Sequence, residues 1–262
     1  MTASFEQHFS EQSLNTKQIL VTGIRDQSLY SFVKKLSDSG ADVESIPLIE
    51  VRFLPINADD VQAFAPDWIF FTSKNAVHAF YQPVETRSQN FLSSSKIAVV
   101  GPSTAEALRS YGKKADFTSP KANAQEAVQT FLEDLSKHPN EKQKPLILWP
   151  CGNRAYPDLA LGLLSAGCNV YPLVAYETLD ATLSETQKEK LQTQTWDIIV
   201  FGSASAVQAY TALSLQENPK TVYACLGSKT RLAVTDAGLK GLCVQGRDSH
   251  YDSLLEAILT FI

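Results

Sequence analysis

The 262-residue sequence is poor in the features that mark membrane, secreted and metal-binding proteins. It holds four cysteines, none spaced as C-x-x-C and none with a histidine at zinc-ligand spacing. It has no run of 18 apolar residues, and its first 16 residues lack the apolar core of a secretory signal. We therefore expect a soluble cytoplasmic protein with buried reduced thiols, no metal, and a poorly ordered polar segment over residues 1–16.

Signatures of common cofactor and substrate classes are also missing. No G-x-G-x-x-G follows the first apolar strand, and there is no G-x-x-x-x-G-K-[ST] or G-x-S-x-G. The net charge is −5 with no block of five like charges, which disfavours nucleic acid as a partner. A dinucleotide, a nucleotide, nucleic acid and a membrane are therefore not expected as partners, and we expect no cofactor.

What the sequence does contain is an internal duplication. The segment DWIFFTSKNAVHAFY matches DIIVFGSASAVQAYT, and corresponding residues stand about 126–130 positions apart. Gly40 pairs with Gly167 in this comparison, and Ser73 pairs with Ser203. A period this long indicates a duplicated domain, because solenoid repeats run to only about 20–50 residues.

Each half alternates strands with helices. An apolar strand (19–22 or 146–149) precedes an amphipathic helix that ends at a glycine, and a second strand then runs into Pro47 or Pro172. Further strand-turn-helix units follow, and the last helices are expected at 124–135 and 251–261. Since the strands are almost wholly apolar, the pattern predicts doubly wound parallel sheets covered by helices on both faces.

Ligands of such sheets bind outside the carboxyl ends of the strands, so the strand-to-helix turns are the candidate functional regions. Four of these turns are small and rich in hydroxyl groups: 72–75, 101–104, 202–205 and 227–230. Each serine or threonine could be a simple helix cap. Together, the four helix N-termini would attract an anionic ligand held between two domains, with Arg25, Lys74, Arg154 and Lys229 adding positive charge nearby.

Tyr176 is a further candidate. It lies in YPLVAYET, which matches IPLIEVRF in the first half. A half-buried strand tyrosine with a structural role would give the same pattern, so the residues alone leave both interpretations open.

The chain resembles the uroporphyrinogen-III synthase family over residues 18–262. The segments that carry the resemblance are FTSKNAV, VGPSTAEAL, GADVESIPLIEV and VYPLVAYET, in that family's order and spacing. The resemblance implies two flavodoxin-like domains joined by a two-stranded antiparallel linker, with linker strands at about 46–54 and 171–179. Domain one would comprise 1–49 plus 176–262, and domain two 52–173.

The resemblance also implies a reaction. A member of this family closes hydroxymethylbilane, a linear tetrapyrrole with many carboxylates, into uroporphyrinogen III, with inversion of ring D and release of water. No cofactor or metal is needed, because folding and holding the substrate does most of the work. A cytoplasmic monomer is expected, with transient contact to the enzyme that supplies the bilane.

Family site residues can be carried over by motif position. Tyr176 would help the hydroxyl of the substrate leave as water. The residues that would bind substrate carboxylates are Thr72, Ser73, Lys74, Thr104, Arg154, Ser203 and Thr230. The first turn departs from the family's usual Thr-Arg-Pro, since Arg25 stands further along, and Cys151 replaces a common basic residue.

Two other functions compete with the synthase. A non-enzymatic two-domain protein that binds a polycarboxylate or a tetrapyrrole would need the same helix N-termini. A flavodoxin-like regulatory module is disfavoured, because no cluster of acidic residues follows the first strand.

Overall fold

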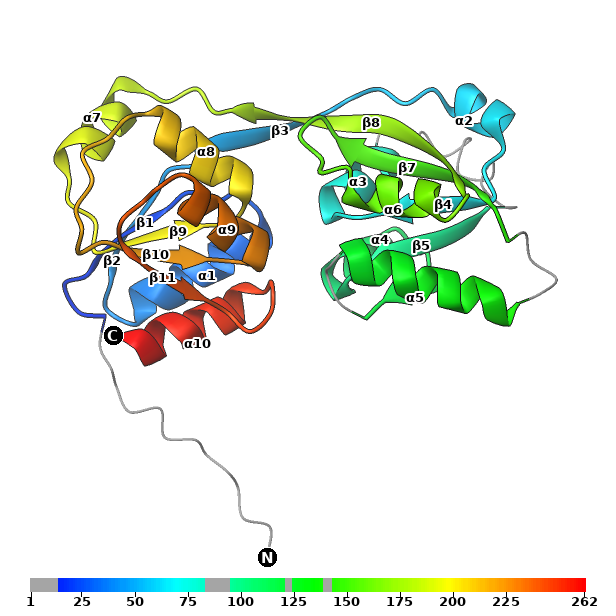
Figure 1. The fold of residues 1–262 in the computed structure, drawn as a ribbon. Helices are drawn as coiled ribbons and strands as arrows, with labels where there is room; N and C mark the ends of the chain where they lie inside the picture. Colours follow the sequence, from blue (N-terminus) through cyan, green and yellow to red (C-terminus); the bar gives the residue numbers. More distant parts are fainter. Residues whose placement is uncertain (1–13, 83–94, 121–123, 139–142) are drawn as a thin grey trace, which may run out of the picture. The chain divides into compact units, whose positions relative to one another are not determined.

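The computed structural model describes residues 14–82, 95–120, 124–138 and 143–262. They form two compact units (Figure 1). Unit 1 combines Met1–Glu50 with Leu179–Ile262, and unit 2 is Val51–Thr178. Both boundaries lie within the segments expected to link the domains, but unit 1 resumes three residues later than residue 176, because the strand that holds Tyr176 remains part of the unit 2 sheet as far as Thr178.

Unit 1 draws its strands from both ends of the chain. Its described sheet has the order β11-β10-β9-β1-β2, and every pairing in it is parallel. The elements are β1 (Gln18–Val21), α1 (Gln27–Asp38), β2 (Asp42–Ser45), α7 (Glu185–Thr193), β9 (Ile198–Phe201), α8 (Ala204–Ala212), β10 (Val222–Cys225), α9 (Ser228–Asp236), β11 (Leu242–Gln245) and α10 (Tyr251–Phe261).

Unit 2 is built on the same plan with one addition. Its described sheet has the order β3-β8-β7-β4-β5-β6, in which β8 to β6 run parallel. The elements are β3 (Ile49–Phe53), α2 (Ala58–Phe64), β4 (Trp68–Phe71), α3 (Lys74–Tyr81), β5 (Lys96–Val100), α4 (Pro102–Ser110), β6 (Phe117–Ser119), α5 (Ala124–Lys137), β7 (Leu146–Gly152), α6 (Asp158–Ser165) and β8 (Asn169–Asp180).

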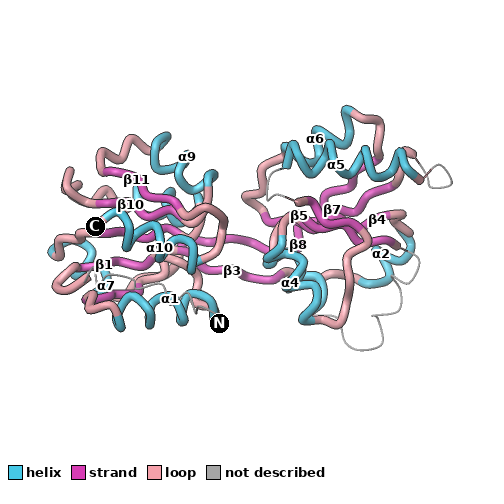
Figure 2. The backbone as a smooth tube through the Cα atoms, turned by 90° about the horizontal axis from the view of Figure 1, so that it is seen from below, coloured by secondary structure: helices cyan, strands magenta, loops and turns pink. Residues whose placement is uncertain are grey.

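Helices cover both faces of each sheet (Figure 2). In unit 1, α1 and α10 pack on one face, and α7, α8 and α9 pack on the other. In unit 2, α5 and α6 cover one face, and α2, α3 and α4 cover the other. The predicted fold class, two doubly wound parallel sheets, is confirmed, and the apolar strands are explained because both of their faces are buried.

The strands β3 and β8 run antiparallel. The Leu54 amide donates to the Ala175 carbonyl at 2.9 Å, and the Ala181 amide donates to the Leu48 carbonyl at 2.9 Å. Between these bonds the Arg52 guanidinium meets the Glu177 carboxylate at 2.5 Å. Backbone bonds and a cross-strand ion pair therefore hold together the two segments at which the chain passes from one unit to the other.

The strand expected to run into Pro172 and the linker strand expected at about 171–179 are one continuous strand. Strand β8 continues through Pro172, which lies opposite Trp149 of β7, and ends only at Asp180. Pro172 precedes the stretch that pairs with β3, so no partner on that side requires its missing N–H group. The proline is therefore tolerated inside a long strand.

The expected polar segment over residues 1–16 lies largely outside the described residues, and it is wrong at Leu14. This side chain is fully buried against the α1 and α10 face of the unit 1 sheet. Its amide donates to the Ser39 carbonyl at 3.0 Å. The packed core of unit 1 therefore begins before the first strand.

The four cysteines are free. Cys151, Cys168 and Cys225 are buried as expected, whereas Cys243 on the edge strand β11 is partly exposed. No helix in the described part of the chain is both long and apolar enough to cross a bilayer.

The duplication preserves one contact that positions the central strands. The Leu146 amide donates to the Asp67 carboxylate at 2.6 Å in unit 2, and the Gln18 amide donates to the Asp197 carboxylate at 2.9 Å in unit 1. Each aspartate precedes one central strand and binds the first residue of its neighbour. The two aspartates therefore fix where paired strands begin, and hence where they end.

We expect Asp67→Ala and Asp197→Ala each to lower the free energy of unfolding by about 1–2 kcal/mol, because a backbone amide loses a charged acceptor. Chemical denaturation measures this loss. Glu189→Ala, at an exposed position of α7, is the control and should stay within about 0.5 kcal/mol of the parent. Equal stability of all three variants would contradict the assigned role.

Candidate functional site at the strand ends

Each sheet contains a point at which the strand order reverses. In unit 2 the chain passes from β7 outward to β8, and from the adjacent β4 outward in the other direction to β5 and β6. In unit 1 the corresponding neighbours are β1 and β9. The loops after two such strands diverge, which leaves a crevice at their carboxyl ends where doubly wound proteins bind ligands.

Tyr176 lies at this point of unit 2. It stands in β8 opposite Gly152, the last residue of β7, at an irregularity in the strand pairing. Its hydroxyl oxygen is 3.2 Å from the hydroxyl oxygen of Ser73, which follows β4. A Cβ atom on Gly152 would lie only 2.6 Å from the Tyr176 ring, so the glycine makes room for the tyrosine. Tyr176 and Ser73, 103 residues apart in sequence, therefore share one small region.

Ser73 combines a structural role with this contact. It is the N-cap of α3, and its hydroxyl oxygen accepts a hydrogen bond from the Ala76 amide at 3.1 Å. Ser203 caps α8 in the same way, accepting from Ala206 at 3.2 Å. The predicted side-chain caps are confirmed at these two turns, whereas α4 and α9 begin at Gly101 and Gly227 without a side-chain cap. Because an accepting hydroxyl keeps its own proton, the Ser73–Tyr176 pair retains a hydrogen that it can donate to a ligand.

Burial raises the pKa of Tyr176 above the ordinary tyrosine value, and the hydrogen bond with Ser73 offsets part of that rise. The phenol is therefore neutral at physiological pH. It can donate a hydrogen bond to an anion or a proton to a leaving group.

The remaining predicted residues differ in their accessibility. Thr104 and Thr230 lie in the first turns of α4 and α9, and they are only 2% and 4% exposed. The Thr72 hydroxyl accepts a hydrogen bond from the Trp149 indole at 3.3 Å. Lys74 begins α3 and is partly exposed, and Arg154 is exposed just after β7. The structure thus brings Ser73, beside Thr72 and Lys74, together with Tyr176, while the two buried threonines offer little surface.

Sequence reasoning missed Gly152, on which the Tyr176 ring packs. A signal was present, because a glycine closely follows the first apolar segment of each half: Gly152 after LILWPC and Gly23 after QILVT. Asn153 was also missed, and its side-chain oxygen accepts from the Thr178 amide at 2.9 Å. These two residues fix the turn against β8.

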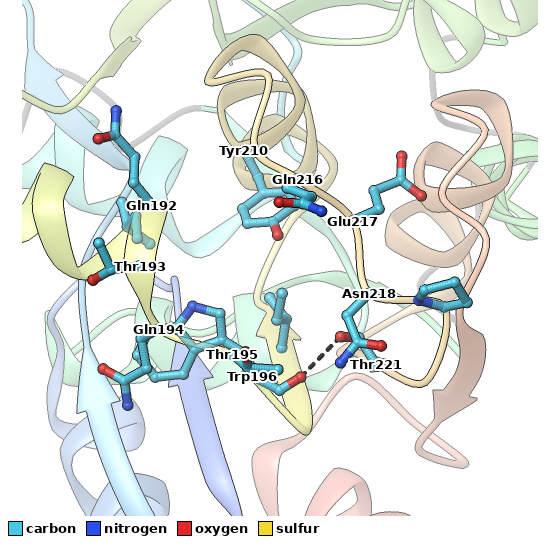
Figure 3. Close-up of a pocket in the computed structure, with 13 residues that line it drawn as sticks. Gln192, Thr193, Gln194, Thr195, Trp196, Tyr210, Gln216, Glu217, Asn218 and Thr221 are labelled. Carbon is cyan, nitrogen blue, oxygen red and sulfur yellow. Dashed lines mark hydrogen bonds between the residues drawn. The ribbon is translucent and has the colours of Figure 1, made fainter.

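Unit 1 has a pocket of about 340 Å³ at the edge of its sheet where the strands begin, and we call it the amino-edge pocket (Figure 3). Trp196 and Thr221 in its wall precede β9 and β10, so the pocket lies at the amino ends of the strands. The Thr221 hydroxyl there donates to the Trp196 carbonyl at 2.8 Å. None of the predicted site residues lines this pocket, and its position differs from that of ligand sites in doubly wound sheets.

The raised pKa of Tyr176 predicts a pH effect on stability. The folded protein holds the phenol proton more tightly than the unfolded chain, so this stabilisation is complete below pH 10.0 and is lost as the pH rises through the folded pKa. Tyr176→Phe should therefore lose less stability than the parent when melting temperatures are compared between about pH 9 and pH 11. Parallel curves would show that the phenol is not held neutral.

Comparisons with known proteins agree on one family. The family model described as uroporphyrinogen-III synthase HemD matches residues 31–255. The porphyrin biosynthesis protein HemD of Ruminiclostridium josui is 27% identical over 262 residues, covering 95% of this chain and 50% of that protein. A uroporphyrinogen-III synthase of Synechococcus elongatus is 33% identical over 133 residues, covering 48% of this chain and 50% of that protein. The chain thus spans about half the length of these curated relatives.

Solved structures share the fold. The uroporphyrinogen-III synthetase of Helicobacter pylori aligns with a TM-score of 0.67 at 17% identity, covering 94% of this chain and all of that chain. A mutant uroporphyrinogen III synthase of Thermus thermophilus aligns with a TM-score of 0.61 at 16% identity, covering 93% and 97%. The resemblance found in the sequence is therefore confirmed. The chain belongs to the uroporphyrinogen-III synthase HemD family.

Proposed function

We propose that this chain converts hydroxymethylbilane into uroporphyrinogen III and water, acting as a cytoplasmic monomer without a cofactor. Membership of the HemD family supports the reaction. The observation that carries the proposal is the neutral Tyr176 hydroxyl beside Ser73 at the strand switch of unit 2. A neutral phenol at the sheet edge where doubly wound folds bind their ligands supports a proton-donor role for Tyr176.

Tyr176 acts on the leaving hydroxyl. Its phenol donates a proton to the hydroxyl carried by ring A, the carbon–oxygen bond breaks, and water departs. The ring A electrons form an electrophilic azafulvene, which the substituted carbon of ring D attacks to give a spiro intermediate. That intermediate fragments and closes again as the type III isomer, and the pyrrole proton that is finally lost restores the phenol.

The helix N-termini bind the substrate. Ser73 and Ser203 each satisfy one first-turn amide, and the remaining first-turn N–H groups of α3 and α8 are donors for substrate carboxylates. Lys74 and Arg154 add positive charge beside the first of these turns. Thr72 contributes a hydroxyl. Thr104 and Thr230 are buried, so they support the first turns of α4 and α9 instead of presenting a surface to the substrate.

A coupled assay tests the proposal. Hydroxymethylbilane is generated in the presence of the protein, the products are oxidised, and the ratio of type III to type I uroporphyrin is measured. Because the bilane closes to type I without a catalyst, the parent protein should shift the product to type III. If type I still dominates and the protein binds uroporphyrin III, the chain is a tetrapyrrole-binding protein instead.

Tyr176→Phe should lower the rate of type III formation by roughly 10- to 100-fold, at or below the usual effect of a lost general acid. Its ring can still pack on Gly152, so the fold should survive, as circular dichroism would show. Tyr171→Phe is the matched control, because Tyr171 lies on the same strand with an exposed side chain. A Tyr176→Phe variant as active as the Tyr171→Phe control would refute the proton-donor role.

A further inference from the structure

Unit 1 has its own tyrosine hydroxyl at the strand switch. Gly23 follows β1 and Gly202 follows β9, the two central strands. A Cβ atom built on Gly23 would lie 2.8 Å from the Tyr251 hydroxyl oxygen, and one built on Gly202 would lie 2.9 Å from it. Tyr251, the first residue of α10, therefore places its oxygen beside both strand ends.

The arrangement matches the one in unit 2 but arises from a different element. Gly152 ends β7, the strand that corresponds to β1 in the repeat, and it packs against Tyr176 as Gly23 packs against Tyr251. Tyr176 belongs to β8, whereas Tyr251 belongs to α10. The repeat itself does not supply both tyrosines, yet each unit presents a phenol at the strand switch of its sheet.

The ring and the hydroxyl group of Tyr251 have different neighbours. The ring packs on Phe32, with 4.8 Å between the ring centroids, and a phenylalanine would preserve this contact. A Cβ atom built on Gly202 would meet the Tyr251 hydroxyl oxygen and the Gly23 backbone, but no atom of the Tyr251 ring. Within the described residues this hydroxyl makes no hydrogen bond to the protein. The residue is partly exposed. Its oxygen is not among the fully buried side-chain atoms without a partner in the described residues, which are those of Tyr81 and Trp196.

The charge state of Tyr251 suits a donor. Burial raises its pKa, and the nearby Asp26 carboxylate raises it further, so the phenol is neutral at physiological pH. A neutral phenol beside a helix N-terminus can donate to a carboxylate without the desolvation cost of a buried cation.

We propose that Tyr251 is a substrate-binding residue of unit 1, whose hydroxyl donates a hydrogen bond to a carboxylate of the tetrapyrrole. This inference rests on the proposed function for its substrate. Its geometry, one phenol between Gly23 and Gly202, is independent of that function.

The test compares Tyr251→Phe with Tyr210→Phe, a control in the same unit whose side chain lines the amino-edge pocket (Figure 3). Tyr251→Phe should raise both the KM for hydroxymethylbilane and the Kd for uroporphyrin III about tenfold, as expected for a lost hydrogen bond to a charged acceptor, without lowering the melting temperature. Parent-like KM and Kd values in Tyr251→Phe would overturn the proposal.

The binding arm separates this proposal from the proposed function. Suppose that the parent makes no type III product but binds uroporphyrin III, and that Tyr251→Phe binds it more weakly. The proposed synthase activity is then refuted, whereas the proposed binding role of Tyr251 is supported. If the parent does not bind uroporphyrin III, the Tyr251 site is rejected.

A double-mutant comparison tests the geometry itself. Gly202→Ala should lower the melting temperature of the parent, because its methyl group meets the Tyr251 oxygen. The same substitution in the Tyr251→Phe background should cost much less, because that oxygen is gone. An equal loss in both backgrounds would show that the Tyr251 hydroxyl does not lie against Gly202.

Discussion

Parallel pairing between strands far apart in the sequence is the constraint on which this structure depends. Ile19 of β1 pairs with Ile198 of β9, and Trp68 of β4 pairs with Ile147 of β7. Each pairing joins two strands whose following elements leave in opposite directions. It therefore brings two strand-to-helix turns together at one edge, and the preserved aspartate contacts at Asp67 and Asp197 set the register in which those turns meet.

The serine and tyrosine donors at these edges are neutral. The chain carries a net charge of −5, so it does not attract a polyanion by its overall charge. Helix N-termini, serine hydroxyls and neutral phenols instead provide local hydrogen-bond donors, and the helix dipoles favour negative charge there. Burial keeps Tyr176 and Tyr251 protonated, so both hydroxyls remain donors across the physiological range.

Features encoded by local sequence could be predicted. The capping serines Ser73 and Ser203 lie where the apolar strands end, and Gly40 and Gly167 close their helices with φ values of +91° and +87°. These features depend on nearest neighbours and on a repeat that is visible in the sequence. The same local patterns predicted the other helices that follow the apolar strands, but they did not predict α2 and α7.

Contacts made across the fold were harder to predict. Tyr176 aligns with Val51 in the repeat, which has no hydroxyl, so self-comparison did not indicate the contact with Ser73. For Tyr251, the sequence predicts only that it begins the last helix. Its position between two glycines depends on α10 packing beside the ends of β1 and β9. The burial of Leu14 has the same cause, because packing against α1 decides it rather than local polarity.

Backbone hydrogen exchange with and without uroporphyrin III tests the central claim, that the carboxyl ends of the strands bind the tetrapyrrole. We expect slower exchange in the first turns of α3 and α8, at residues 74–77 and 204–207, when the porphyrin is added. Protection confined to the amino-edge pocket around Trp196 and Thr221, with the first turns unchanged, would contradict it.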